Sequence, residues 1–179
     1  MKPIIETARL YIRELLPTDV EGMFDLDSNP EVHQYLGNHP VQTKEEIRGV
    51  IDFIRQQYVD HGIGRWAMVD KETNEFIGWT GFKYVTTTTN NRANFYDLGY
   101  RLCQKYWGKG LATEAGMACL DYGFNQLGYQ EVFATADCNN EGSNHILRKL
   151  GFTCIETFDW DGIPHFWYRL DKETFETRK

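Results

Sequence analysis

The sequence predicts an α+β fold, with a mixed and mostly antiparallel central sheet of about seven strands flanked by helices. Three consecutive strand patterns occupy residues 65–102 with only a turn and a loop between them, which indicates an antiparallel meander. Helical and strand patterns then alternate until a closing hairpin pattern. A doubly wound parallel sheet would need helices between nearly all of its strands, so the meander argues against it.

The chain before the meander predicts one strand and three helices. Residues 9–15 alternate and form the first strand, and Pro17-Thr18-Asp19 stops it and starts a short helix. A second short helix follows. The third is the most clearly marked, because Thr43 and Glu46 form a capping box and Gly62 ends the helix. Its apolar face consists of Ile47, Val50, Ile51, Ile54 and Tyr58.

The meander consists of the strands Arg65–Asp70, Glu75–Val85 and Asn94–Leu102. The helix that follows, from about residue 109 to residue 127, is apolar on two stripes, the second of which contains Met117. We expect such a helix to be buried on more than one side.

The last third of the chain predicts a buried strand over residues 131–138 and a helix that ends at Gly151. The closing hairpin, residues 152–170, turns at Asp161-Gly162, which is a strong turn signal. Pro164 near the mouth of this hairpin predicts an edge position, since proline cannot donate to a strand ladder.

Composition limits the classes of protein. The 179 residues include 41% hydrophobic and 25% charged residues, and we expect one domain over residues 1–179 because no repeat or linker interrupts them. The net charge of −7 argues against a nucleic-acid partner. It is compatible with a cationic substrate, although an acidic balance is also a common route to solubility.

The cysteines and histidines predict neither disulfides nor a metal site. Four scattered cysteines without a C-x-x-C pair are typical of reduced thiols in a cytoplasmic protein, and five histidines show no metal-ligand spacing. Residues 1–15 lack the apolar core of a signal peptide, and no apolar run is long enough to cross a bilayer. We therefore expect a soluble cytoplasmic protein without a membrane partner.

A glycine-rich turn, Trp107-Gly108-Lys109-Gly110, separates the last meander strand from the buried helix. Glycines at a helix N-terminus leave several N–H groups unpaired at the positive end of the helix dipole, which suits a phosphate or pyrophosphate. A bare Gly-x-Gly is also found in ordinary strand-to-helix turns.

With this turn after a meander and before a buried helix, the sequence resembles the GNAT superfamily of acyl-CoA N-acyltransferases. Within it, the match is closest to the ribosomal-protein N-terminal acetyltransferase branch. The resemblance rests on Glu6-Thr7-Ala8-Arg9-Leu10, Asp97-Leu98-Gly99-Tyr100, Tyr106–Ala115, Asn140-Glu141-Gly142-Ser143 and Leu150-Gly151-Phe152.

The resemblance implies a GNAT fold and an N-acetyltransferase that moves an acetyl group from acetyl-CoA to a primary amine, without a metal. The implied acceptor is a protein or peptide N-terminal α-amine. A small amine such as a polyamine or amino-sugar, and a non-catalytic acyl-CoA sensor, are the alternatives. A monomer and a homodimer both stay open.

The superfamily's acyl-CoA loop has the pattern Arg or Gln, any, any, Gly, any, Gly or Ala, and Trp107 departs from its first position. This departure leaves the pyrophosphate to main-chain donors. The implied cofactor-binding residues of this stretch are Gly108, Lys109, Gly110, Leu111, Ala112 and Thr113. Lys109 either adds a charge or is simply solvated. The resemblance also implies that the Leu102 backbone pairs with the pantetheine arm and that Asn140 holds it from the facing side.

The implied catalytic residues are Asp97 and Ser143. Asp97 occupies a position where relatives usually carry Glu, and would act as base directly or through water; a plain solvated carboxylate is the alternative. Ser143 would give a proton to the thiolate, because the Tyr that many members carry seven residues after Asn140 is Leu147 here; a helix cap is the alternative. Neither Cys103 nor Cys138 has a cue for covalent catalysis.

Two other features of the sequence have alternative interpretations. A Rossmann-type enzyme would need a third glycine at Thr113 and an acidic residue closing the next strand, whereas Glu131 opens it. Aromatic residues on the strands could line an acceptor cleft or belong to the core; they are Tyr35, Trp66, Trp79 and Phe82.

Overall fold

The computed structural model describes residues 3–178. The strands are β1 (Ile5–Glu6), β2 (Leu10–Glu14), β3 (Arg65–Asp70), β4 (Phe76–Val85), β5 (Phe95–Leu102), β6 (Glu131–Asp137), β7 (Thr153–Trp160) and β8 (Ile163–Asp171). The helices are η1 (Pro17–Asp19), α1 (Val20–Asp27), α2 (Pro30–His33), α3 (Lys44–His61), η2 (Gln104–Tyr106), α4 (Leu111–Asn125), α5 (Glu141–Leu150) and α6 (Lys172–Thr177). Of the expected domain span, residues 1, 2 and 179 lie outside the described part.

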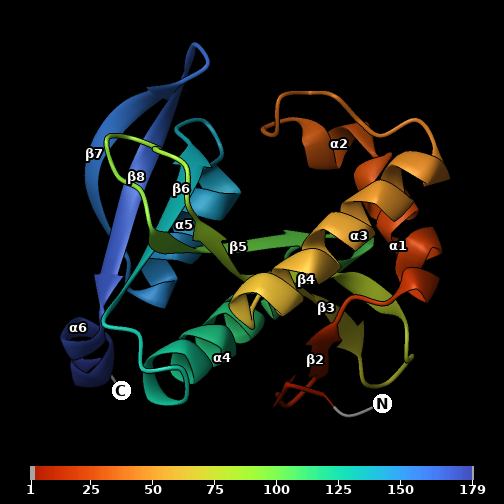
Figure 1. Cartoon of the computed structure of the whole chain (residues 1–179), viewed down its shortest axis with the longest axis horizontal. Coiled ribbons are helices and arrows are strands. Elements are labelled where there is room, and N and C mark those ends of the chain that lie inside the picture. Colours follow the sequence, from red (N-terminus) through yellow and green to blue (C-terminus); the bar gives the residue numbers. More distant parts are fainter. Residues whose placement is uncertain (1–2, 179) are drawn as a thin grey trace.

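One sheet contains all eight strands in the order β1-β2-β3-β4-β5-β6-β8-β7 (Figure 1). The pair β5 and β6 is parallel and every other neighbouring pair is antiparallel. The predicted α+β class with a mixed, mostly antiparallel sheet is confirmed. The sheet has one strand more than expected because the two-residue β1 also pairs with β2.

The helices cover both faces of the sheet (Figure 1). Side chains of α1, α2 and α3 pack with Leu15, Ala67 and Trp79 into one cluster, and α4 packs against the other face in the main core. The Thr43 cap of α3 is confirmed, since the Thr43 hydroxyl accepts from the Glu46 N–H at 3.3 Å. The reciprocal half of the expected box differs, because the Glu46 carboxylate accepts from the Gln42 N–H at 3.3 Å and from the Thr43 hydroxyl at 2.8 Å. Gly62 ends the helix with a left-handed φ of 71°.

Two further expectations need correction, and one helix was not expected. Pro164 lies on β8, which is an internal strand; its missing N–H is tolerated because it lies one residue beyond the last β6 partner, His165. Met117 is 39% exposed, so α4 is buried on a narrower arc than its composition indicated. The sequence reading also missed α6, whose first turn is capped by Asp171 accepting from the Thr174 N–H at 2.8 Å.

β4 and β5 approach each other closely where Gly78 faces Leu102. Gly78 has a φ of 149°, and a Cβ atom there would lie 2.1 Å from the Arg101 carbonyl oxygen. Because the obstacle is backbone, side-chain rotation cannot relieve the clash. This glycine therefore allows the close pairing that fixes the end of β5.

We predict that Gly78→Ala lowers the free energy of unfolding by about 3 kcal/mol, the cost of forced overpacking with backbone strain. Gly49→Ala is the matched control, because Gly49 is exposed on α3 with nothing within 4 Å of an added Cβ. The control should gain about 1 kcal/mol from helix propensity. Urea denaturation measures both, and a Gly78→Ala protein as stable as wild type would contradict this account of the strand pair.

Candidate functional site

β5 has one paired edge and one open edge. It pairs with β4 over its whole length, whereas its pairing with β6 is confined, in the described part of the chain, to Asp97 and Phe133. β5 and β6 diverge beyond this point (Figure 1). The Cys103 N–H donates to β4, so strand alternation directs the main-chain groups of Tyr100 and Leu102 away from β4. They face the gap between β5 and β6.

The glycine turn, residues 107–110, follows β5 and η2 and is exposed. Gly108 and Gly110 have φ angles of 73° and 76°, which glycine adopts without steric cost. Gly110 caps α4 without a side chain, so the first N–H groups of that helix, Leu111 to Thr113, have no side-chain acceptor at the cap. The turn has the geometry that anion binding needs, at the same end of β5 as the open edge.

Trp107 ties this turn to the strand. Its indole Nε1 donates to the Leu102 carbonyl oxygen at 2.8 Å, although the side chain is 45% exposed. The bond occupies the last main-chain acceptor on the open edge and leaves the Leu102 N–H as the donor that faces the gap. Trp107, which departs from the Arg or Gln of the superfamily pattern, thus has a structural role in fixing the end of β5. The spacing of the motif did not indicate this role.

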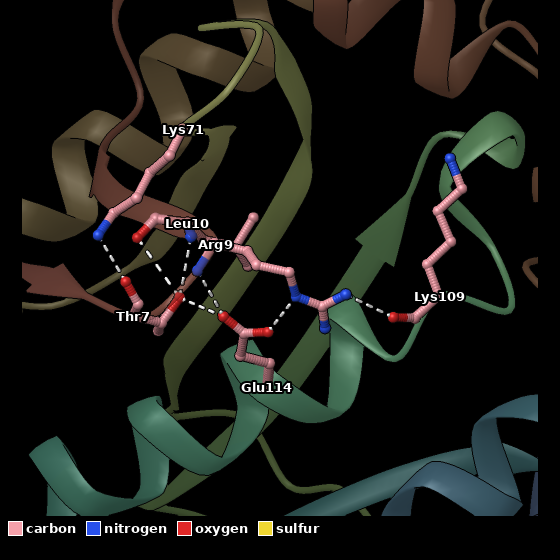
Figure 2. A network of polar contacts seen from close by, with 6 residues as sticks. All are labelled: Thr7, Arg9, Leu10, Lys71, Lys109 and Glu114. Atoms are coloured by element: carbon pink, nitrogen blue, oxygen red, sulfur yellow. Dashed lines mark hydrogen bonds and ion pairs between the residues drawn. The ribbon is translucent and has the colours of Figure 1, made fainter.

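A polar network holds the turn from behind (Figure 2). Arg9 donates through Nη1 to the Lys109 carbonyl oxygen at 2.8 Å and through Nε to Glu114 at 2.6 Å. The other Glu114 oxygen accepts from the Thr7 hydroxyl at 2.6 Å and from the Arg9 N–H at 2.9 Å. Burial acts to raise the pKa of Glu114, but these hydrogen bonds together lower it, so the carboxylate is charged at neutral pH. The Lys109 ammonium lies 5.1 Å from the Tyr106 ring centre.

The opposite side of the gap is the N-terminus of α5. Asn140 caps this helix, since its Oδ1 accepts from the Ser143 N–H at 3.1 Å. The Ser143 hydroxyl is therefore not the cap. It lies 3.2 Å from the Tyr100 hydroxyl, which donates to the Ser143 carbonyl oxygen at 3.0 Å. Two hydroxyls from facing elements meet at the gap.

Tyr100 is a functional candidate that sequence reasoning did not single out. Burial raises its pKa well above the usual range, against the hydrogen bond to Ser143, so its hydroxyl keeps its proton. Tyr100 lies two residues before Leu102 on β5, so its main chain faces the same way. This spacing indicates a role only when the open edge of β5 is known.

Asp97 lies on the opposite face of β5 and pairs with Arg65 through Oδ2. The Arg65 side chain reaches it by crossing Gly99, where a Cβ would lie 2.7 Å from the guanidinium carbon. Burial raises the pKa of Asp97 above its usual value, while Arg65 and then Lys83 act in the opposite direction. Asp97 is thus a carboxylate largely shielded from solvent and paired with Arg65, and not the plain solvated group that was the alternative. It does not contact Ser143, because the two side chains lie on different faces.

A second ion pair, with a buried carboxylate, lies on the same face as Asp97. Arg101 donates to Asp27 at 2.7 Å, and His33 Nε2 lies 3.8 Å from the same oxygen. The ring of Trp79 lies between two guanidiniums, 5.4 Å from Arg65 and 5.0 Å from Arg101.

Of the aromatic candidates, two belong to the core. Trp66 and Phe82 are 2% and 0% exposed and pack edge to face. Trp79 and Tyr35 are half-buried. The core alternative therefore holds for Trp66 and Phe82.

The four cysteines are free thiols. Burial raises the pKa of Cys103 to about 11 and that of Cys138 above its usual value, so neither is a ready nucleophile. Over residues 3–178, no cluster of three or more His, Cys, Asp or Glu side chains is arranged to hold a metal ion. None of the described helices combines the length and the apolar character that a membrane span requires.

Comparison with known proteins identifies the arrangement. The model of the acetyltransferase (GNAT) domain family matches residues 9–153. The uncharacterized N-acetyltransferase YoaA of Bacillus subtilis is 33% identical over 152 residues, which cover 85% of this chain and 84% of that protein. The spermidine N(1)-acetyltransferase of Escherichia coli is 29% identical over 143 residues, which cover 79% and 72%.

Among solved structures, the ribosomal L7/L12 α-N-protein acetyltransferase RimL in complex with coenzyme A superposes with a TM-score of 0.80. The match covers 97% of this chain and 99% of that one, at 16% sequence identity, and so shows a shared fold.

Proposed function

This chain belongs to the acetyltransferase (GNAT) family, and on that premise we propose that the acceptor of its acetyl group is the N-terminal α-amine of a protein or peptide. The family match and the named relatives show the general activity: the chain is an acetyl-CoA-dependent N-acetyltransferase. The observation that carries the proposed binding mode is the open edge of β5 ending at an exposed glycine turn.

The carrier in this proposal spans the gap between β5 and β6. Its diphosphate accepts from the main chain of Gly108–Thr113, and its pantetheine arm pairs with Leu102 as an added strand. Asn140 contacts the arm from α5 through the amide group that its capping oxygen leaves available. The Leu102 N–H pairs with the arm, because Trp107 already occupies the Leu102 carbonyl oxygen. A strand N–H near Leu102 then donates to the thioester oxygen, a contribution of about 3 kcal/mol to transition-state stabilisation.

Proton transfer to the thiolate is assigned to Ser143. As the neutral amine attacks the thioester carbon, the carbon–sulfur bond breaks and the sulfur takes up a proton from the Ser143 hydroxyl. The surplus proton on the nitrogen passes through water and restores that hydroxyl. Tyr100 supports this role because its hydroxyl lies 3.2 Å from that of Ser143 and stays protonated. Asp97, with its raised pKa, is the proposed base for the amine, reached through a bridging water.

The charges on the Asp97 face favour a peptide acceptor. A polyamine carries several ammonium groups and needs carboxylates that are free to bind them. On this face of the described chain, the half-buried Asp97 and the buried Asp27 already pair with Arg65 and Arg101. The similarity to a spermidine acetyltransferase makes a polyamine the second candidate.

The extent of the domain over residues 1–179, the cytoplasmic location and the oligomeric state stay predictions. The free thiols agree with a reducing compartment.

We expect Gly110→Glu to abolish CoA binding, because the added carboxylate puts a negative charge at the turn that binds the diphosphate. Its Cβ would also start 3.6 Å from Arg9 Nη2, so the carboxylate would compete with the Lys109 carbonyl for that guanidinium. Gly162→Glu is the control: Gly162 has a similar φ of 83° and open space around it, but lies in the β7–β8 turn. It imposes the same left-handed strain without the charge at the site. Isothermal calorimetry measures the affinity of both variants for CoA. If Gly110→Glu still binds CoA, the glycine turn is not part of the binding site.

Ser143→Ala should lower kcat by about a hundredfold, the usual scale for a lost general acid, and leave the affinity for acetyl-CoA nearly unchanged. The fold should be unaffected because Asn140 provides the helix cap. Thermal melting checks this point and stopped-flow thiol release gives the rate. An unchanged kcat would exclude Ser143 as the proton donor.

The acceptor class is tested with a thiol-release assay and mass spectrometry. The panel contains peptides with free N-termini, the same peptides blocked at the N-terminus but with an internal lysine, spermidine and an amino-sugar. Acetylation of the free N-termini alone is expected. Preferential turnover of spermidine would replace the peptide proposal with the polyamine one.

A further inference from the structure

Arg9 lies about a hundred residues before the glycine turn in the sequence, yet it contacts that turn from its reverse side. Its guanidinium joins the Lys109 carbonyl oxygen in the turn to the Glu114 carboxylate in the first turn of α4 (Figure 2). The Nη2 atom lies 3.6 Å from the position that a Cβ on Gly110 would take. Arg9 is therefore in contact with the turn at the residue where α4 begins.

The geometry of the peptide bond gives this contact a direction. The carbonyl of Lys109 and the N–H of Gly110 belong to one planar trans peptide, so they point to opposite sides. Because Arg9 holds the carbonyl on its own side at 2.8 Å, the Gly110 N–H points to the other side. Gly110 adjoins this peptide and has a wide range of φ angles, so without the Arg9 contact the peptide could turn more easily.

We propose that Arg9 is a positioning residue for acetyl-CoA: it fixes the Lys109–Gly110 peptide so that the Gly110 N–H is directed at the diphosphate. This inference rests on the proposed binding of acetyl-CoA at the turn. Arg9 acts from behind the peptide and does not touch the ligand. In the superfamily's acyl-CoA loop pattern the first position is Arg or Gln, and here it is Trp107. Arg9 would therefore help to order this loop from outside it.

Glu114 and Thr7 make Arg9 rigid enough for this role. One Glu114 oxygen accepts from the Arg9 Nε, and the other accepts from the Arg9 N–H and the Thr7 hydroxyl. Three donors on one carboxylate fix both the backbone and the side chain of Arg9. Two directions of the guanidinium fork are used at once, which a lysine cannot reproduce.

A simpler role has to be separated from positioning. Glu114 is a negative charge in the first turn of α4, close to where the diphosphate would bind, and Arg9 could act only by neutralising it. Neutralisation requires Arg9 only while Glu114 is present. Positioning requires Arg9 whether or not Glu114 is charged.

The test measures CoA affinity by calorimetry and pantetheine affinity by NMR titration, in the full chain. Arg9→Met should weaken CoA about tenfold and leave pantetheine, which lacks the diphosphate, unchanged. The double variant Arg9→Met/Glu114→Gln should keep the same loss. Arg9→Lys, which retains the charge but not the fork, should lose nearly as much as Arg9→Met.

Arg48→Met is the matched control, because Arg48 is an exposed arginine paired with Glu45 on α3; it should bind CoA as wild type does. Three results would overturn the inference: unchanged CoA affinity in Arg9→Met, restored affinity in the double variant, or an equal loss for pantetheine. Failure of the wild-type protein to bind CoA would instead overturn the proposed function.

Discussion

The early end of the β5–β6 pairing is the constraint on which the rest of the structure depends. A parallel pair that continued to Leu102 would satisfy the main chain of β5 internally and leave nothing for a ligand. Instead the pairing stops at Asp97 and Phe133. The strand end then carries unsatisfied main-chain groups beside a glycine turn, so an extended ligand with an anionic end meets complementary donors along its length.

Such a gap in the middle of a sheet needs support from outside the ladder. α4 starts at the turn, packs against β4 and β5 and also contacts α5. The Tyr100 hydroxyl joins β5 to α5 directly across the gap. Trp107 closes the end of the strand by binding the Leu102 carbonyl. The same groups that hold the two halves in place therefore line the proposed site.

Features set by short stretches of sequence were predictable, and features set by distant partners were not. Local patterns identified the Thr43 cap of α3 and the left-handed turn glycines, because each depends on a few neighbouring residues. The pairing of Asp97 with Arg65 and the contact of Tyr100 with Ser143 depend on strand register and on the angle between β5 and β6. Nothing local encodes these. For the same reason β8 was misread as an edge strand, since its neighbour β6 lies elsewhere in the chain. The catalytic roles of Asp97 and Ser143 stay predictions.

Recognition by main-chain atoms also affects how this sequence can diverge. Every residue offers the same N–H, so in the proposed mode most side chains around the turn can change while the contacts to the ligand persist. Selection would then act on the glycines and on remote braces such as Arg9, and not on a conspicuous row of charged contact residues. This is one physical reason why two chains can keep a common scaffold at 16% identity, and why a cofactor site of this kind leaves only a faint trace in any single sequence.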